Sequence, residues 1–381
     1  MEKTLRSSNF ELLRIVAMLL IILNHACQYG ISIEDASFYQ TNFCLSKIFY
    51  IWTGNLGNWL FIMTSGYFLS KSKFSWKKFF NMWAQVLFFS VLIGTIIYVF
   101  KLPVYRQYND LNQLYEFRNI SLREYVESFF PVILGKNWFA TAYLVFYLFI
   151  PFLNKSLDVL DKELHARLII LMSLLGTVLN CIPKQAIIQT NYLFYFILGY
   201  YIASYIRIYE PKFLSKNKNN LIISGLLILM FIIWEFLLCK LRLNSSYQIL
   251  TNESTFYKLL SIPIATNRFP ILICSIFLFS FFKNLNIRYS VLINTFASSC
   301  FSVYLIHENP LFNNFMWKKL LFSDYFSTSK FLPLWMLLTP IIVFLFSFPF
   351  EVFRKYIFQI IGILYKHIQL KFEEVREYEN K

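Results

Sequence analysis

Long continuous apolar runs, separated by short polar segments, make up most of the chain. A helix needs about 20 apolar residues to cross the roughly 30 Å hydrocarbon core of a bilayer. The runs do not alternate, which argues against the strands of a membrane β-barrel. We therefore predict an all-α integral membrane protein, a bundle of about ten transmembrane helices, at residues 10–30, 45–69, 76–100, 138–153, 168–182, 192–208, 221–238, 262–282, 291–307 and from 331 onward.

Lysine and arginine gather in alternate connections between these predicted spans. They precede the first span and follow the second, fourth, sixth, eighth and tenth. Short loops rich in these residues stay in the cytoplasm, so we expect both the N- and the C-terminus on the cytoplasmic side. The chain then forms one membrane domain over residues 1–366, followed by a charged cytoplasmic tail over residues 367–381.

The composition agrees with a membrane protein. Hydrophobic residues make up 57% of the chain and charged residues 15%, against about a quarter charged in a typical soluble domain. The net charge is +15, but the basic residues flank the spans, so we expect membrane lipids and no nucleic acid as partners. The six cysteines include no Cys-x-x-Cys pair and lie mostly in apolar runs. We interpret them as small core residues and expect no metal site.

Ionisable residues inside the first span are the strongest candidates for function, because charge within a membrane is costly. Arg14 and His25 are eleven residues apart, which places them on one helix face, about 16 Å apart along the axis. Glu11 lies three residues before Arg14, where the two side chains can pair. A snorkelling arginine and a hydrogen-bonded core histidine are the alternative, but the complete stripe favours a functional role.

This stripe and three later motifs resemble the integral membrane acyltransferase family called acyltransferase type 3. That family begins with an acidic residue, then an arginine and, after ten intervening residues, a histidine. Its other motifs are similar to residues 61–67 (FIMTSGY), 137–143 (NWFATAY) with 150–153 (IPFL), and 302–307 (SVYLIH). The matches follow the family's order and cover nearly the whole chain.

The resemblance implies transfer of an acyl group, usually acetyl, from cytoplasmic acetyl-CoA across the membrane. The implied acceptor is a hydroxyl of a surface polysaccharide or a lipid-linked glycan, so we expect a multi-pass protein of the plasma membrane, of bacterial origin. By the same resemblance His25 is the catalytic base or a transient acyl carrier, and Arg14 belongs to the donor site. The chemistry agrees, because an imidazole can take the proton of a weakly nucleophilic sugar hydroxyl as its oxygen attacks the thioester.

Further candidates lie on the second span and in the loop after it. Lys71 and Lys73 stand where the family commonly has Arg-x-Arg, and either bind donor phosphates as point charges or only anchor the loop. Ser65 either donates a hydrogen bond to the developing oxyanion or is a small residue that allows close helix packing. We group Ser65 and Glu11 with His25 as catalytic candidates, and both alternatives for Ser65 stay open.

Four residues are candidates for binding the acceptor glycan. Tyr304 and His307 share a polar face at the end of the ninth span, although a histidine at the membrane interface needs no function. Trp138 either stacks on a sugar or belongs to the belt of interfacial tryptophans. Glu235, within the seventh span, either binds the acceptor or pairs with Arg268.

A transporter or flippase of a glycan intermediate is the main alternative, since ten spans, intramembrane charge and proline-containing helices suit transporters too. Transporters commonly have two related halves, and the sequence shows no internal repeat. A scaffold without catalysis would leave the buried arginine and histidine unexplained. The sequence therefore favours an acyl-CoA-dependent O-acyltransferase and leaves open its acceptor, acyl length and oligomeric state.

Overall fold

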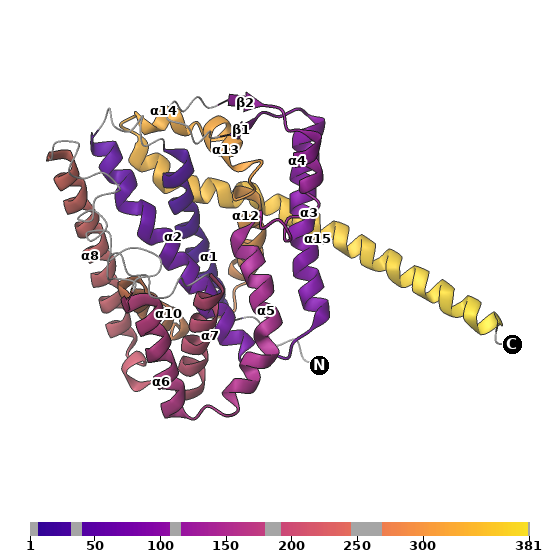
Figure 1. Ribbon diagram of the computed structural model, residues 1–381, viewed down its shortest axis with the longest axis horizontal. Coiled ribbons are helices and arrows are strands. Elements are labelled where there is room, and N and C mark those ends of the chain that lie inside the picture. Colours follow the sequence, from indigo (N-terminus) through magenta and orange to yellow (C-terminus); the bar gives the residue numbers. More distant parts are fainter. Residues whose placement is uncertain (1–6, 32–39, 107–115, 180–191, 245–268, 380–381) are drawn as a thin grey trace.

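The computed structural model describes residues 7–31, 40–106, 116–179, 192–244 and 269–379. Helical segments stand at all ten places where spans are predicted (Figure 1). They are α1 (Ser8–His25) with the π-helix η1 (Ala26–Gly30), α2 (Gln40–Leu69), α3 (Trp76–Val99), α5 (Trp138–Leu157), α6 (Lys162–Ser173) with the π-helix η3 (Leu174–Val178), α7 (Tyr192–Tyr209), α8 (Asn217–Asn244), α10 (Phe269–Lys283), α11 (Val291–Ala297) with α12 (Cys300–His307), and α15 (Leu332–Glu379).

Shorter elements connect these helices. Two strands, β1 (Val104–Arg106) and β2 (Glu116–Arg118), pair antiparallel in the long connection after α3. The other short elements are α4 (Leu122–Glu127), the 3₁₀-helix η5 (Lys212–Leu214), α13 (Asn313–Phe315), the π-helix η7 (Met316–Leu320) and α14 (Ser323–Ser327). Apart from this two-stranded pairing, the regular structure of the described residues is helical, as predicted.

Five helices in the described part of the chain are long and apolar enough to cross a membrane: residues 8–30, 76–99, 138–157, 217–239 and 332–367. α10, and α11 together with α12, are shorter apolar helices. The 18 residues of α7 include six tyrosines, whose hydroxyl groups lower its hydropathy. The protein is thus a helical multi-pass membrane protein. The count of ten spans and the cytoplasmic side of both termini stay predictions, and residues 180–182 and 262–268 of two predicted spans lie outside the described residues.

α15 is the longest helix and is not interrupted by its two prolines, Pro340 and Pro349. It continues beyond residue 366, where the charged tail begins, so the tail starts as helix. In Figure 1 the C-terminal part of α15 projects away from the rest of the bundle. Its first half packs against α1 and α12, which brings the last helix of the chain into contact with the first.

α1 lies at the centre of the bundle. It contacts α2, α10, α11, α12 and α15, and it is the most buried of the five candidate spans. Leu13, Ala17 and Ile22 are completely buried along it. The glutamate, arginine and histidine of this helix are therefore placed inside the protein, and protein groups replace the lipid around them.

Glycines allow α2 to approach its neighbours closely. A Cβ atom added at Gly57 would lie 2.6 Å from the backbone oxygen of Ala17 on α1, and one added at Gly66 would lie 2.7 Å from the Cα atom of Tyr200 on α7. Both contacts are with backbone, which cannot move aside as a flexible side chain can. Small residues at such crossings are typical of packed membrane helices, and here they hold α2 between α1 and α7.

Candidate active site

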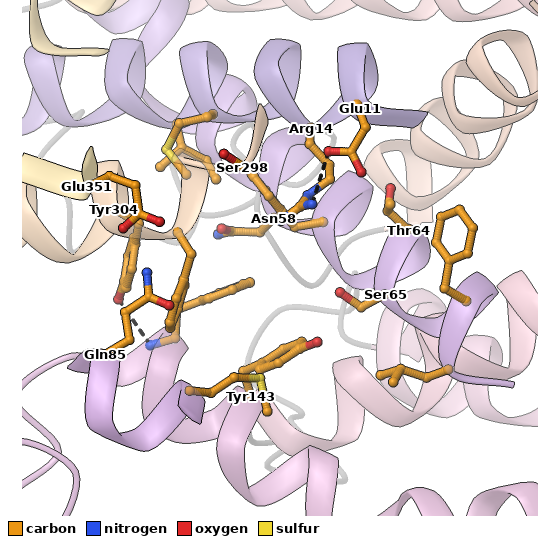
Figure 2. Close-up of a pocket in the computed structure, with 18 of the residues that line it drawn as sticks. Glu11, Arg14, Asn58, Thr64, Ser65, Gln85, Tyr143, Ser298, Tyr304 and Glu351 are labelled. Atoms are coloured by element: carbon orange, nitrogen blue, oxygen red, sulfur yellow. Dashed lines mark hydrogen bonds and ion pairs between the residues drawn. The ribbon is translucent and has the colours of Figure 1, made fainter. Parts of the chain in front are cut away.

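A pocket of about 480 Å³ opens between α1 and α2 on one side and α3, α5, α12 and α15 on the other (Figure 2). Part of its lining is apolar, with Met18 and Ile21 from α1, Phe61 from α2 and Phe139 from α5. The charged lining residues all come from α1 and α15, and uncharged polar residues come from α2, α3, α5 and the segment from Ser298 to Tyr304. The pocket therefore combines charged, polar and apolar side chains around one cavity.

The α1 side of the pocket carries the predicted ion pair. Arg14 Nη1 lies 3.2 Å from Glu11 Oε2, and both residues line the pocket with Met18 and Ile21. The spacing of these four residues follows one helix face, and continuing it by four more residues reaches His25. Two residues of the predicted stripe, Glu11 and Arg14, thus line the pocket with Met18 and Ile21, while His25 lies beyond its wall.

The α15 side carries a charged network that the sequence analysis missed. Arg354 donates from Nε to Glu351 Oε2 and from Nη2 to Glu351 Oε1, both at 2.7 Å. Lys355 Nζ lies 3.3 Å from Glu351 Oε1 and donates to Ser298 Oγ at 2.8 Å. The Ser302 hydroxyl donates to the same carboxylate. Glu351 is buried to 1% exposure, so it needs these donors.

Two other sequence candidates also line the pocket. Ser65 on α2 and Tyr304 on α12 are both part of its wall, and Figure 2 shows them with Tyr143 around the same space. Tyr304 Oη accepts a hydrogen bond from the backbone N–H of Phe139 at 3.2 Å. Tyr304 is therefore fixed in position against α5.

The other candidates lie elsewhere. Lys71 and Lys73 are exposed in the loop after α2 and are not part of the pocket wall. Trp138 packs against Tyr192, with ring centroids 4.0 Å apart. Glu235 is buried in α8, away from the pocket lining, and its proposed partner Arg268 lies outside the described residues. The structure brings none of these four residues to the pocket.

The side chain of His25 does not line the pocket but contacts His307 and Glu308. His25 is the last residue of α1, immediately before the π-helix η1, and His307 is the last residue of α12. His25 Nδ1 lies 2.9 Å from His307 Nε2 and 3.1 Å from Glu308 Oε1. All three side chains are nearly or fully buried. Residues 282 positions apart thus form one polar cluster, which we call the His25 cluster.

The hydrogen bonds of His307 determine which nitrogen of His25 is free. His307 Nδ1 lies 2.6 Å from the backbone oxygen of Val303. A carbonyl oxygen can only accept, so Nδ1 carries the hydrogen and a neutral His307 has its lone pair on Nε2. That lone pair faces His25 Nδ1, which must therefore donate. The neutral His25 ring then keeps an unprotonated Nε2, the form that a general base requires.

The His25 cluster lies just beyond the part of the pocket wall formed by Ile21 and Tyr304. Ile21 and Tyr304 are part of the pocket wall, and His25 and His307 follow them by four and three residues on α1 and α12. At about 1.5 Å per residue, these distances along the helices are roughly 6 Å and 4.5 Å. One helical turn thus separates the pocket lining from the imidazole groups.

The His25 cluster is also the group of described residues whose ligand atoms lie close enough to hold a metal ion. One ligand atom each from His25, His307 and Glu308 lie within 4.8 Å of one another. Hydrogen bonds hold the two histidines without an ion, whereas Glu308 Oε1 is buried without a hydrogen-bond partner. The expectation that the site contains no metal therefore stays a prediction.

Comparison with known proteins agrees with the motifs. A model of the acyltransferase type 3 family, described as an acyltransferase domain, matches residues 7–353. This range includes the pocket wall up to Glu351 and the complete His25 cluster. Searches against characterised proteins and against solved structures gave no match. Because the match extends over nearly the whole chain, the protein belongs to the acyltransferase type 3 family of membrane acyltransferases.

Proposed function

We propose that this membrane acyltransferase moves an acyl group, in the simplest case acetyl, from cytoplasmic acyl-CoA to a hydroxyl of a surface polysaccharide or a lipid-linked glycan. The observation that supports this most directly is the α1 stripe, which runs from an arginine in a charged pocket to a buried histidine with a free Nε2. An acceptor on the outer side places the protein in the plasma membrane, and a surface glycan of this kind is expected of a bacterium.

The pocket suits a donor with a charged head and a long neutral arm. Coenzyme A carries phosphate groups at its nucleotide end and the thioester at the far end of its pantetheine arm. Arginine recognises phosphate oxygens with its planar fork, and Arg14 lies in the charged part of the pocket. The arm would then lie along Met18, Ile21 and Phe61, with the thioester directed toward Tyr304 and His25.

In the acyl-transfer step, His25 Nε2 takes the proton of the acceptor hydroxyl while its oxygen attacks the thioester carbonyl. The new C–O bond forms, the C–S bond breaks, and the imidazolium returns its proton to the leaving thiolate. The Glu308 carboxylate, 3.1 Å from His25 Nδ1, stabilises the imidazolium while it exists. A second route has His25 carry the acyl group itself before the acceptor attacks. Both routes need a free Nε2.

Membership of an acyltransferase family argues against the flippase alternative, since a flippase breaks no thioester. The roles of Ser65, Lys71, Lys73, Trp138 and Glu235 stay predictions. Ser65 lies on the pocket wall, which suits a contact with the donor better than a contact with the His25 ring. Tyr304 lies between the pocket and the His25 cluster, where the reacting groups must meet.

Transfer of radiolabel tests this function. The purified protein, reconstituted in vesicles, is given acetyl-CoA labelled in the acetyl group on the side of its N-terminus and extracted surface glycan on the opposite side. We expect label in the glycan and free coenzyme A in equal amount. Label that stays entirely in acetyl-CoA, with unmodified glycan crossing the membrane, would instead indicate a flippase.

A further inference from the structure

The α1 wall and the α15 wall of the pocket differ in net charge. On α1, one arginine faces one carboxylate, Arg14 and Glu11. On α15, two cations, Arg354 and Lys355, share the single carboxylate of Glu351. Counting formal charges, the α1 wall sums to zero and the α15 wall to +1. The surplus positive charge of the pocket therefore lies on α15. In the sequence, its two cations resemble the basic residues that ordinarily flank a membrane span.

We propose that Arg354 and Lys355 form the binding site for the 3′-phosphate of the donor's nucleotide, an assignment that rests on the acyl-CoA donor of the proposed function. Both cations line the pocket, and the nucleotide, which carries the phosphate groups of the donor, belongs beside the surplus positive charge on α15. The 3′-phosphate is on the ribose, far along the molecule from the pantetheine arm. Lys355 is half-exposed, with 48% of its side chain accessible, as expected at the entrance of a pocket.

Arg354 is held ready for such a ligand. Its Nε and Nη2 are engaged by Glu351, and its guanidinium lies 4.8 Å from the ring centroid of Phe358. Within the described residues, Nη1 donates no hydrogen bond, so both of its hydrogens remain for a ligand. Because the side chain is already fixed, binding loses little conformational entropy.

Lys355 complements this fixed arginine as a mobile charge. Its Nζ contacts the Ser298 hydroxyl and the Glu351 carboxylate, and a phosphate oxygen can replace either contact. The side chain of Gln85 donates to Ser302 Oγ at 2.7 Å, which in turn donates to Glu351. This chain from α3 keeps the carboxylate satisfied when Lys355 turns to the phosphate. The network therefore survives ligand binding without leaving a buried charge unpaired.

Donors that differ in one phosphate test the site. Acetyl-CoA and acetyl-dephospho-CoA, which lacks only the 3′-phosphate, are compared by kcat/KM in phosphatidylcholine vesicles. We expect wild-type protein to have the higher kcat/KM with acetyl-CoA. Lys355→Ala should reduce the ratio of the two kcat/KM values about tenfold, the effect expected from losing a charge-assisted hydrogen bond. Arg354→Lys should also reduce the preference for acetyl-CoA, and it keeps a positive charge beside the Glu351 carboxylate. Lys366→Ala, an exposed lysine on the same helix outside the pocket, should keep the full preference.

The proposal is overturned if Lys355→Ala slows both donors equally and keeps the wild-type preference. It is also overturned if the effect of the substitution appears only when the vesicles contain phosphatidylglycerol, since the site would then hold a lipid headgroup. If wild-type protein transfers from neither donor, the proposed function fails, and binding of adenosine 3′,5′-bisphosphate decides the site. Weaker binding of the bisphosphate by Lys355→Ala, but not by Lys366→Ala, would support the assigned site. Equal binding by wild-type protein and both variants would contradict it.

Discussion

At the residue scale, the reactivity assigned to His25 depends on a second histidine. His307 is oriented by the carbonyl of Val303 and accepts from His25 Nδ1, which leaves His25 Nε2 as the free base. Glu308 adds a carboxylate at 3.1 Å from the same Nδ1. His307 is a candidate for acceptor binding by sequence, and these contacts support a second hypothesis, that it positions His25.

Replacing His307 should therefore impair the chemical step more than binding. We expect His307→Ala to lower kcat about 10- to 100-fold, the equivalent of losing a buried hydrogen bond worth about 1–3 kcal/mol, with little change in the donor KM. His307→Gln, which can still accept from His25, should recover part of the rate. His165→Gln, at a buried histidine outside the pocket wall, serves as the control. A rise in the KM for the glycan acceptor, with unchanged kcat, would instead indicate that His307 binds the acceptor.

Removal of metal ions tests whether the three ligand atoms of the His25 cluster hold an ion. We expect extensive dialysis against a chelator to leave acyl transfer unchanged, because hydrogen bonds hold both histidines in place. Metal analysis of the purified protein completes the test. An equimolar metal that His307→Ala removes, together with loss of activity on chelation, would contradict the hydrogen-bonded arrangement.

At the element scale, the site depends on close contacts between helices. Both histidines are the last residues of α-helices, and the chain after His25 enters a π-helix, a local change that recurs at functional sites. α2 approaches α1 through Gly57 and packs against α7 through Gly66. A small displacement of α1 would move the whole stripe from Glu11 to His25.

A methyl group at Gly57 should disturb this packing. Its Cβ atom would meet the backbone oxygen of Ala17 at 2.6 Å, and we expect Gly57→Ala to destabilise the protein by about 1–3 kcal/mol, as overpacking does. Gly225→Ala on α8 is the matched control, because an added Cβ there meets nothing within 4 Å, and it should be neutral or slightly stabilising. Thermal unfolding in detergent compares the two, and equal melting temperatures would show that α1 and α2 can separate without cost.

The helices themselves were largely predictable, because a membrane requires long apolar segments whose backbone hydrogen bonds are internal. The pairing of Glu11 with Arg14 was predictable too, since both lie on one helix turn. The partners of His25 were not, because nothing in a single sequence joins residue 25 to residues 307 and 308. The α15 network was missed for another reason: Arg354 and Lys355 look like ordinary positive-inside residues, although Glu351 within an apolar run was a signal.

At the scale of the whole molecule, the position of the stripe along α1 implies a direction for the proposed reaction. The charged pocket includes residues near the start of α1, and the His25 cluster lies near its other end. If the N-terminus is cytoplasmic, the donor enters from the cytoplasm and the acyl group is delivered toward the outside. The orientation of the bundle is therefore part of the mechanism that we propose.

Labelling of introduced cysteines tests that orientation. We expect Lys216→Cys, between α7 and α8, to be protected from a membrane-impermeant reagent in intact cells, and Asn119→Cys, before α4, to react. The basic connection after α7 should stay in the cytoplasm. Reaction of both positions, or of neither, would contradict the ten-span arrangement and with it the proposed path of the acyl group.

The most direct measurement of the central claim is acyl transfer by His25→Ala, made in vesicles with labelled acetyl-CoA and extracted glycan. We predict that this variant inserts normally and binds acetyl-CoA as tightly as wild-type protein. Its transfer rate should fall by about 10²–10⁴-fold if His25 acts as a general base, and to the uncatalysed level if it carries the acyl group. Near-normal glycan acetylation by His25→Ala would contradict the account.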